Sequence, residues 1–368
     1  MSGRAQKDAR NLGTRREPLP LTDRHPAGGS PALTLNTEPL MSVVITSYTL
    51  DRWTELECAL DSLRSQTYRN LEIIVVTEGP RELRDRVRSY ADNHLMENLT
   101  VVVNDGLPGL SPARNLGIRH ARGEIIGFID DDATAGSDWA ARIVGTFARN
   151  EQAIGLTGPA YPRWQDESCQ WLPEEFYWII SCTAGAWSGP NEFREVRNAL
   201  GVNMAFRREA FSVQSFSEKF VGGNQGHSDG AKGGLLGEDT EFCLKLRHET
   251  KRPIYYCPDV SVEHHVGASR LTAPFIWRRC FWEGYTKATL GHLLHEEYGG
   301  GGELASESRL LRRILFHLLP RIALLSLRNP RLAWQKFGLT VTVLGNVALG
   351  FAAARIPFFG RRIASRYS

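Results

Sequence analysis

The sequence of 368 residues lacks the cysteine pattern of a zinc protein or of a disulfide-stabilised secreted domain. It contains no Cys-x-x-Cys pair, and this spacing favours a reducing compartment. The six cysteines are scattered along the chain: Cys58, Cys169, Cys182, Cys243, Cys257 and Cys280. The N-terminus also lacks the apolar stretch of a signal peptide, so we expect most of the chain to stay in the cytoplasm.

Acidic residues are missing from the C-terminal part of the chain. Between Ser308 and Ser368 there are eleven Lys and Arg residues and no Asp or Glu. The first 307 residues therefore hold 33 basic and 41 acidic residues, a net charge of −8 within an overall charge of +3. Leu, Ile and Phe are interleaved with the basic residues of the tail, which favours a membrane surface over nucleic acid as its polyanionic partner.

Two helical segments are predicted in this basic tail. The first has an apolar face opposite Arg309, Arg312 and Arg313, and Pro320 should kink the helix at its C-terminal end. The residues of that apolar face are Leu310, Leu311, Ile314, Leu315, Leu318 and Leu319. The second segment, 337–354, has 18 uncharged residues, about the minimum for a membrane-spanning helix. We favour binding at the membrane interface over a full span, and a helix buried in the protein is the alternative.

The order of apolar runs predicts the fold class. Residues 1–38 are polar and without periodicity, which predicts a disordered leader. Beyond them, short apolar runs alternate with helical patterns, which predicts an α/β fold with a mostly parallel sheet and helices on both faces. The expected strands are 42–47, 71–77, 100–104 and 124–129, and the expected helices are 52–66, 80–95, 112–122 and 137–149. Right-handed crossovers would bring the ends of the first and fourth strands to one rim of the sheet.

Three consecutive aspartates, Asp130, Asp131 and Asp132, come directly after the apolar run 124–129. Carboxylates this close repel one another unless a divalent cation neutralises them, and hard oxygen ligands of this kind suit Mg²⁺ or Mn²⁺. Ligands of open α/β sheets gather just past the carboxyl ends of strands. The alternative is a solvated acidic turn before a helix N-terminus, and the triplet alone does not separate the two.

A helix with an anion-binding start precedes these aspartates. Ser111 is its predicted cap, Pro112 its first residue and Gly123 its end. Arg114 and Asn115 lie in the first turn, where a guanidinium and the helix N-terminus would attract an anion together. A metal-bridged diphosphate would use both this helix start and the aspartates.

Five motifs, in order along the chain, resemble those of a known enzyme family. They are Ser42–Tyr48, Leu71–Val76, Ala113–Gly117, Phe128–Asp132 and Leu236–Glu241. Together they resemble the nucleotide-sugar domain of inverting glycosyltransferases of family 2, which have the GT-A fold, and the similarity covers about residues 40–290. Four further segments resemble the archaeal-type enzymes that add glucuronosyl units to dolichyl-phosphate-linked glucose: Trp171–Trp178, Arg197–Asn198, Asn203–Arg208 and Arg278–Tyr285.

This resemblance, with the changes of pattern along the chain, implies four regions. They are the leader 1–38, a nucleotide-sugar-binding half 39–150, an acceptor and catalytic half 151–292, and a basic, membrane-associating helical tail 293–368.

The acceptor half is less regular than the half before it. Glycines at 222–226 and 233–237 suggest a flap that closes over a substrate. A helix is expected at 238–250 and a last strand at 254–262. Four tryptophans either fill this loop-rich layer or stack on sugar rings: Trp164, Trp171, Trp178 and Trp187.

The resemblance assigns metal ligands to this sequence. Asp130 and Asp132 take the places of the family's Asp-x-Asp pair, and Asp131 would support them. Asp132 would bind the metal, Mg²⁺ or Mn²⁺, and Asp130 would bind the ribose or the metal with its water shell. His264 matches the family's late metal or diphosphate ligand, whereas His265 should face the other way because successive strand residues alternate.

The resemblance also implies a nucleotide-sugar site. Its expected residues are Thr46, Ser47, Tyr48, Thr77, Glu78, Arg114, Asn115, Asp130 and Asp131. Many relatives carry an acidic pair after the second strand that binds the base, and this chain has Thr77 and Glu78 there. The departure weakens the case for uridine, although a UDP-sugar such as UDP-glucuronate or UDP-glucose is still favoured.

The expected catalytic residues lie in the Glu-Asp motif. Asp239 matches the general base that deprotonates the acceptor hydroxyl for in-line attack, and Glu238 would hydrogen-bond the acceptor or orient the base. The alternative is that both carboxylates only stabilise a helix N-terminus.

A basic cluster lies further along. Arg270, with Arg278, Arg279 and Trp282, would hold a diphosphate or the phosphate of a lipid-linked acceptor. A solvated basic face explains these residues equally well.

The sequence therefore predicts a metal-dependent inverting glycosyltransferase. Its expected partners are a nucleotide-sugar donor, a polyprenyl-phosphate-linked or other saccharide acceptor, and the cytoplasmic face of a membrane, with no nucleic acid. A soluble or polysaccharide acceptor, or a non-catalytic nucleotide- or sugar-binding module, are the alternatives. A nucleotidyltransferase is disfavoured because the first strand runs into 48–52 without a glycine-rich loop.

Overall fold

The computed structural model describes residues 38–183, 191–218, 236–298 and 305–356. The predicted leader before Glu38, Trp187 and most of the predicted glycine flap (222–226 and 233–235) lie outside these described residues.

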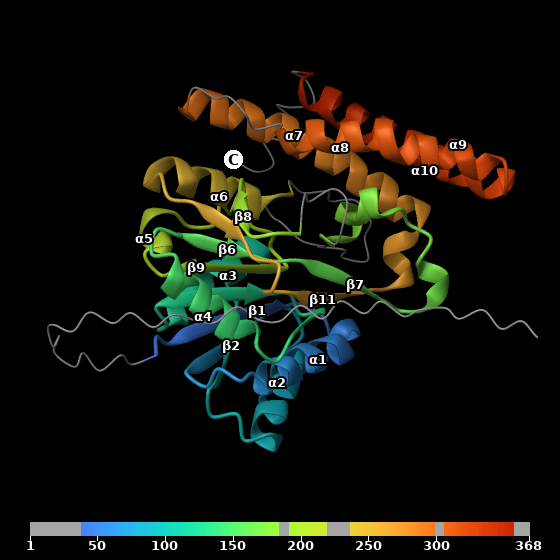
Figure 1. The fold of residues 1–368 in the computed structure, drawn as a ribbon. Helices are drawn as coiled ribbons and strands as arrows, with labels where there is room; N and C mark the ends of the chain where they lie inside the picture. Colours follow the sequence, from blue (N-terminus) through green and yellow to red (C-terminus); the bar gives the residue numbers. More distant parts are fainter. Residues whose placement is uncertain (1–37, 184–190, 219–235, 299–304, 357–368) are drawn as a thin grey trace, which may run out of the picture. The chain divides into compact units, whose positions relative to one another are not determined.

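An eight-stranded sheet forms the centre of the described chain (Figure 1). Its order is β3-β2-β1-β4-β9-β6-β10-β8, and its first four strands are parallel. β9 runs antiparallel between β4 and β6. The strands are β1 Met41–Ser47, β2 Leu71–Thr77, β3 Leu99–Val103, β4 Ile125–Ile129, β6 Gly155–Thr157, β8 Arg194–Val196, β9 Asn203–Arg207 and β10 Ile254–Tyr256. The predicted mostly parallel α/β sheet is confirmed.

A second, three-stranded sheet has the order β5-β11-β7. Its strands are β5 Ala133–Ala135, β7 Ala160–Trp164 and β11 Val262–Val266. The single strand predicted at 254–262 was wrong, because β10 and β11 are separate strands in different sheets. Pro258 has no amide hydrogen to donate, and it lies in the turn that separates them. β11 pairs His264 with Ala133, immediately after the three aspartates.

Helices cover both faces of the large sheet because successive strand side chains point to opposite sides. Met41, Val43 and Ile45 of β1 share one core with α1, α2 and α4. Val44 shares the other core with α3, α5 and α6. The helices are α1 Trp53–Arg64, α2 Arg81–Asn93, α3 Leu110–His120, α4 Trp139–Arg149, α5 Ala210–Val213 and α6 Glu238–Thr250.

The N-terminus of α3 differs from the prediction. Its N-cap is Gly109, not Ser111, which lies inside the helix and is buried. Gly109 has a φ of 134°, in the region that favours glycine, and its amide donates to Glu78 Oε2 at 2.9 Å. The helix ends at His120, before the predicted Gly123. The prediction from Ser111 and Pro112 placed the N-cap too late, because the helix is capped by the backbone conformation of Gly109 and not by a side chain.

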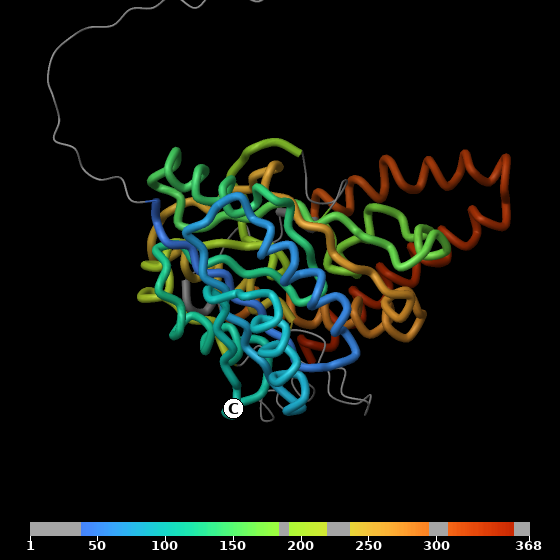
Figure 2. The backbone as a smooth tube through the Cα atoms, turned by 90° about the horizontal axis from the view of Figure 1, so that it is seen from below, coloured from blue at the N-terminus to red at the C-terminus, as the bar shows by residue number. Residues whose placement is uncertain are grey.

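A third core joins the C-terminal helices to the loop-rich middle of the chain. In it, Phe176 and Ile180 of the 3₁₀ segment η3 (Glu174–Ile180) share a cluster with Ile314 and Leu318. The C-terminal elements are α7 Ala273–Tyr298, α8 Ala305–Arg313, η5 Ile314–Leu318, α9 Leu319–Ser326 and α10 Pro330–Ala354. Figure 2 shows these helices beside the sheets, with α9 and α10 forming a hairpin.

The apolar face predicted for 310–319 is only partly buried. Ile314 and Leu318 are buried, whereas Leu311 and Leu315 are 47% and 56% exposed. η5 is a π-helix, so the regular period of 3.6 residues assumed for this segment does not hold from Ile314 onward. The segment precedes Pro320, which cannot donate the hydrogen bond that a regular α-helix needs.

α10 packs closely along α7 at two glycines. A Cβ atom on Gly284 of α7 would lie 1.9 Å from the carbonyl oxygen of Val347, and one on Gly350 of α10 would lie 1.9 Å from that of Phe281. Within the described part of the chain, α10 is the helix long and apolar enough to cross a membrane, by length and composition alone. Only 22% of its apolar window is buried, so it is not the fully buried helix that was the alternative.

Candidate active site

The carboxyl ends of β1 and β4 meet, as predicted, and bring Ser47 beside Asp131. The Ser47 hydroxyl donates to Asp131 Oδ2 at 2.7 Å, and Arg52 Nη1 lies 2.8 Å from Asp131 Oδ1. Burial raises the pKa of Asp131, although the charge of Arg52 opposes this. Asp131 is thus held by Ser47 and Arg52, although it still borders the cavity described below.

Asp132 lies in contact with a histidine and two arginines. Its Oδ1 is 3.1 Å from His264 Nε2, and its Oδ2 is 2.6 Å from Arg270 Nη2 and 3.0 Å from Arg52 Nη1. Asp130, Asp132 and His264 each offer one ligand atom, all within 4.8 Å of one another. His265 instead points to Glu55 of α1, with Nδ1 3.2 Å from Oε1, so only one of the two histidines reaches the site, as predicted.

This group fits a divalent cation. Asp132 Oδ1 is buried without a hydrogen-bond donor, although His264 Nε2 is only 3.1 Å away. Arg270 Nη1 lies 3.1 Å from the same Nε2, and because a guanidinium can only donate, a hydrogen bond between them requires the tautomer in which Nε2 carries no hydrogen. In that tautomer, two lone pairs face one another. A cation between these two atoms would satisfy both lone pairs. The carboxylates of Asp130 and Asp132 suit Mg²⁺ or Mn²⁺, and imidazole is a ligand of transition-metal ions.

Arg114 of α3 links the aspartates to the Glu-Asp motif. Its Nη1 is 2.8 Å from Glu238 Oε1, and its Nη2 is 3.4 Å from Asp130 Oδ1. Nη2 also donates to the carbonyl of Gly201 at 3.1 Å. Burial and the neighbouring Asp239 raise the pKa of Glu238, while Arg114 opposes them.

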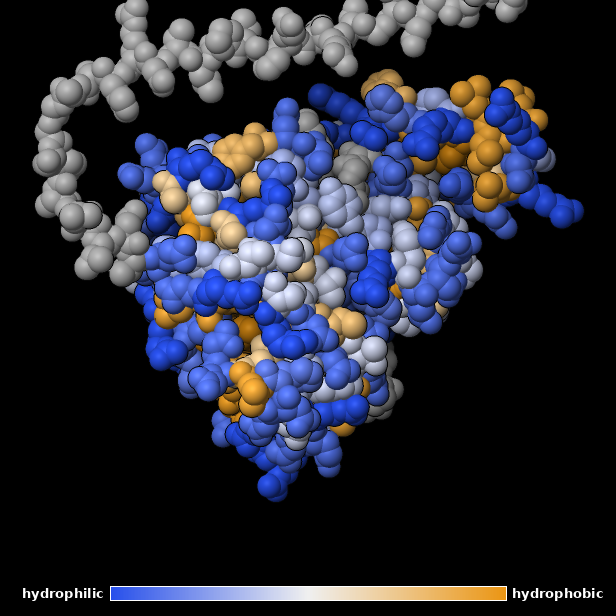
Figure 3. Space-filling model, turned by 60° about the horizontal axis from the view of Figure 1, so that its bottom comes forward, coloured by the Kyte–Doolittle hydropathy of each residue, from blue (hydrophilic) through white to orange (hydrophobic). Residues whose placement is uncertain are grey.

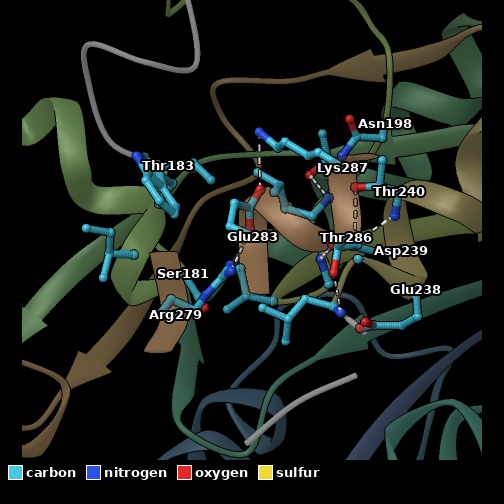
Figure 4. Close-up of a pocket in the computed structure, with 18 of the residues that line it drawn as sticks. Ser181, Thr183, Asn198, Glu238, Asp239, Thr240, Arg279, Glu283, Thr286 and Lys287 are labelled. Carbon is cyan, nitrogen blue, oxygen red and sulfur yellow. Dashed lines mark hydrogen bonds and ion pairs between the residues drawn. The ribbon is translucent and has the colours of Figure 1, made fainter. Parts of the chain in front are cut away.

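Asp239 is held at the N-terminus of α6 by backbone amides. Its Oδ2 accepts from the amide of Gly201 at 2.8 Å, and its Oδ1 accepts from that of Thr240 at 2.6 Å (Figure 4). Asp239 is partly exposed and lines a cavity of about 830 Å³, whereas Glu238 is 6% exposed. The aspartate is therefore the carboxylate better placed to take a proton from a bound hydroxyl.

The cavity runs along the rim of the sheet and reaches several predicted donor-site residues. Those that line it are Thr46, Ser47, Tyr48, Glu78, Arg114, Asp130 and Asp131. Glu78 is fixed there, because its Oε2 accepts from Asn104 Nδ2 at 2.8 Å as well as from the Gly109 amide. The carboxylate therefore stands at the start of α3, on the donor side of the cavity.

Two predicted donor-site residues lie outside the cavity lining. Thr77 is buried and its hydroxyl donates to the carbonyl of Val102 at 3.3 Å. Asn115 is also buried, and it bonds the backbone of Phe216 twice, at 2.8 and 3.1 Å. Asn115 comes directly after Arg114 on a helix, so its side chain points about 100° away.

The opposite side of the cavity is formed by α7, α8, η5 and α10. On α7, Glu283 bonds Arg279 at 2.5 Å and Lys287 at 3.2 Å (Figure 4). Burial would raise the pKa of Glu283, but Lys287 and Arg279 lower it to about 2. Apolar residues line the rest of this side: Leu290, Leu310, Leu311, Ile314, Val343, Leu344 and Val347. Arg309 of α8 lies among them.

The predicted cluster of Arg278, Arg279 and Trp282 separates in the structure. Arg279 lines the cavity, Arg278 is exposed outside it, and Trp282 packs against Phe281 and Tyr285 with ring centroids 5.6 and 5.4 Å apart. Sequence reasoning missed Glu283 and Lys287. Glu283 lies four residues after Arg279 and Lys287 lies four residues after Glu283, and this spacing was the signal that could have found them.

The chain is similar to a known family and to curated proteins. Residues 42–213 match the family described as glycosyl transferase family 2. Among curated proteins, the "Glucosyl-dolichyl phosphate glucuronosyltransferase" of Haloferax volcanii is 30% identical over 253 residues, covering 68% of this chain and 77% of that protein. The "Succinoglycan biosynthesis protein ExoM" of Rhizobium meliloti is 28% identical over 261 residues, covering 63% and 77%.

Two solved structures share the fold. A mannosyltransferase from Pyrobaculum calidifontis, in complex with GDP-Man and Mn²⁺, has a TM-score of 0.55 at 19% identity and covers 87% of this chain and 89% of its own. The structure of GalNAc-T7 with UDP, GalNAc and Mn²⁺ has a TM-score of 0.50 at 16% identity, covering 77% and 58%. At these identities the likeness concerns the fold alone.

Proposed function

Because this chain belongs to the family 2 glycosyltransferases, we propose that it moves a sugar from a nucleotide diphosphate donor to a lipid-linked saccharide at the cytoplasmic face of a membrane, with inversion at the anomeric carbon. The observation that carries the proposal is the cavity itself. It begins at the strand-end carboxylates, passes Asp239, and ends between apolar helices. The carboxylates would suit a polar, cation-bound donor, and the apolar helices would suit the hydrocarbon tail of an acceptor.

The donor diphosphate belongs at the carboxylate end. Asp132, Asp130 and His264 would hold the cation, which neutralises the charge of the leaving diphosphate. Arg114, at the N-terminal turn of α3, adds a guanidinium on the same side. The relative's name supports glucuronate as the sugar, so UDP-glucuronate is the first donor to test, with UDP-glucose second. Because Thr77 is buried, Glu78 and Tyr48 would bind the base.

Asp239 is the proposed general base. Its carboxylate accepts from the Gly201 amide and from the amide and hydroxyl of Thr240, which leaves a lone pair for a further hydrogen, and it lines the cavity. Taking the proton of the acceptor hydroxyl lets the oxygen attack opposite the leaving diphosphate, which inverts the anomeric centre. Glu238, fixed by Arg114, would position the neighbouring aspartate.

The acceptor would carry a phosphate and a polyprenyl chain. Arg279, Lys287 and Arg309 place positive charge at the end of the cavity where the lining turns apolar. A phosphate bound there would leave its hydrocarbon chain along Ile314 and Val347. The relative named for glucosyl-dolichyl phosphate supports the same class of acceptor.

Attachment at a membrane surface is supported by the hairpin of α9 and α10. Figure 3 shows apolar side chains gathered at the end of the C-terminal helices, mixed with polar ones. The most exposed are Phe316, Leu324, Leu327 and Trp334, at 71%, 67%, 82% and 71%. The arginines Arg321, Arg328 and Arg331 lie on the same segments. Apolar groups with flanking cations are typical of helices that lie in an anionic interface.

The test is a transfer assay with purified protein and Mn²⁺. Radiolabelled UDP-glucuronate, UDP-glucose and GDP-mannose are each offered with farnesyl-phosphate-linked glucose, with glucose alone and with a soluble polysaccharide. We expect label only in the lipid-linked product and its loss in Asp239→Asn. Equal labelling of a soluble acceptor would overturn the lipid assignment, and donor binding without transfer to any acceptor would indicate a non-catalytic module.

A further inference from the structure

We propose that Arg270 exchanges partners during the catalytic cycle, from the metal ligands Asp132 and His264 to the diphosphate of the donor. The proposal rests on the proposed function for the identity of the donor. It concerns binding alone, so it can be tested without turnover or acceptor.

Arg270 and a divalent cation need the same lone pair of His264, and both bind the carboxylate of Asp132. The Arg270 side chain bonds Asp132 Oδ2 through Nη2 at 2.6 Å and meets His264 Nε2 through Nη1 at 3.1 Å. His264 can coordinate a cation only through the lone pair of a ring nitrogen, and Nε2 is the one that faces Asp132. Its other nitrogen, Nδ1, faces the thiol of Cys182 at 3.6 Å. Coordination by His264 therefore excludes the contact with Arg270.

Arg270 also lies between the cavity and these ligands. Asp132 is 4% exposed and His264 is 0% exposed, and neither lines the cavity. Arg270 does line it, with 14% of its side chain exposed. A cation that enters from the cavity must move Arg270 before it reaches both ligand atoms. The arginine is thus a competitor that covers the metal site from the substrate side.

The displaced guanidinium would have a natural second partner. Once a cation binds Asp132 Oδ1 and His264 Nε2, Arg270 loses its contact with His264 and shares the charge of Asp132 with the cation, which repels it. Leaving this guanidinium so poorly paired is costly unless another anion replaces the carboxylate. The cavity in front is where Arg114 and the start of α3 favour a diphosphate. A guanidinium binds two phosphate oxygens at once, and a diphosphate carries a second phosphate group that a nucleoside monophosphate lacks.

Arg52 provides the contrast within the same cluster. It bonds Asp131 as well as Asp132, at 2.8 and 3.0 Å, and no contact joins it to His264 among the described residues. A cation on Asp132 Oδ1 and His264 therefore leaves Arg52 with its partner Asp131. Only Arg270 has to move, and cation binding then precedes and favours diphosphate binding by linkage.

The test measures two affinities in Arg270→Gln. Mn²⁺ alone is titrated by electron paramagnetic resonance, and then UDP and GDP, each beside its monophosphate, are titrated by calorimetry at saturating Mn²⁺. Because a charged competitor is removed, we expect Mn²⁺ to bind about ten-fold more tightly. Because the displaced guanidinium is gone, both diphosphates should bind about ten-fold more weakly, with the monophosphates little changed. The two effects have opposite signs.

Two further variants control the experiment. Arg278→Gln, on the exposed side of α7, should change neither affinity. Arg270→Lys keeps the charge but cannot bond Asp132 and His264 together, so it should also bind Mn²⁺ more tightly, and it serves if the glutamine variant does not fold. Unchanged Mn²⁺ affinity, or weaker binding of Mn²⁺ and diphosphate together in a folded variant, would overturn the exchange. That result would not contradict the proposed transferase function, which the transfer assay tests separately.

Discussion

The two sides of the cavity are held in place by different forces. On the proposed donor side, polar side chains at the ends of the strands and on α3 and α6 hydrogen-bond one another. For example, Ser47 donates to Asp131, and Arg114 donates to Glu238. On the proposed acceptor side, α7, α8, η5 and α10 contribute mainly apolar residues, with a row of charges on α7 and Arg309 on α8. The donor side therefore fixes individual atoms, and the acceptor side fixes a surface.

This difference has a chemical reason. Neutralising a diphosphate needs charges at defined positions, because electrostatic stabilisation falls when a ligand atom moves. A hydrocarbon chain needs only an apolar surface of the right width, since burial of apolar area has no direction. Substitutions on the donor side should accordingly change rates, and those on the acceptor side should change acceptor affinity or stability.

The largest effect is expected for Asp132→Ala. It removes the oxygen that lacks a donor and faces His264, so cation binding should fall and transfer should drop by about 10³-fold or more. Initial rates across a Mn²⁺ titration measure this, with the exposed Asp259→Ala as control. Full turnover of the native protein in excess EDTA would contradict the assigned cation.

Asp239→Asn should reduce transfer by about 10²- to 10⁴-fold while donor affinity stays the same, because an amide cannot take the proton. The asparagine can still accept from the amide of Gly201 or of Thr240, so the loop should keep its place. Single-turnover rates, with calorimetry for the donor, separate the two quantities. A parallel fall in donor affinity would mean that Asp239 belongs to the donor site.

On the acceptor side, Glu283→Gln should destabilise the protein. The folded-state pKa of about 2 lies below the ordinary 4.5, so the carboxylate stabilises the fold above about pH 4.5, and this contribution is lost as the pH falls toward 2. We expect a loss of about 2 kcal/mol at pH 7 that shrinks toward pH 3, with allowance for partial exposure.

Urea unfolding at pH 7 and pH 3 measures the Glu283 effect. The exposed Glu249→Gln should show little difference between the two pH values. A loss in Glu283→Gln that is the same at both would mean that the ion pairs with Arg279 and Lys287 are not its source.

The smallest effect is expected for Arg309→Gln, which should raise the KM for farnesyl-phosphate-linked glucose about five-fold without changing kcat. Arg309 is exposed but lines the cavity, so it contributes charge to the acceptor phosphate more than structure. Arg312→Gln, three residues along the same helix and outside the cavity lining, is the matched control. Equal effects of the two substitutions would point to membrane attraction instead of a phosphate site.

The sequence predicted the donor side better than the acceptor side. Apolar runs located β1 and β4, and the rule that parallel strands end at one rim placed Ser47 near Asp131. The pairing of Asp132 with His264 has no local signal, because 132 positions separate the two residues, and only the resemblance suggested it. Arg270 and Arg52 were not expected at Asp132, since which cation covers a carboxylate depends on tertiary contacts.

On the acceptor side, local patterns were overridden by packing. The apolar face of 310–319 was assigned from a regular helical period, which the π-turn of η5 breaks. Trp282 was expected in the site because it is aromatic and near Arg279, but it points to Phe281 and Tyr285. Amphipathic periodicity predicts which residues share a helical face, but it does not predict whether that face packs against the protein, lines a cavity or is exposed.

The contact of α7 with α10 through Gly284 and Gly350 has a consequence for how such a sequence can diverge. These glycines touch no proposed ligand, yet any larger side chain at either position would collide with a carbonyl oxygen and push apart the two helices that bear Lys287 and Val347. The width of the proposed acceptor channel thus depends on the absence of a Cβ atom at these two glycines. A wider channel, suited to a bulkier lipid if the proposed function holds, would therefore follow from substitutions at these two positions, with every residue that lines the cavity unaltered.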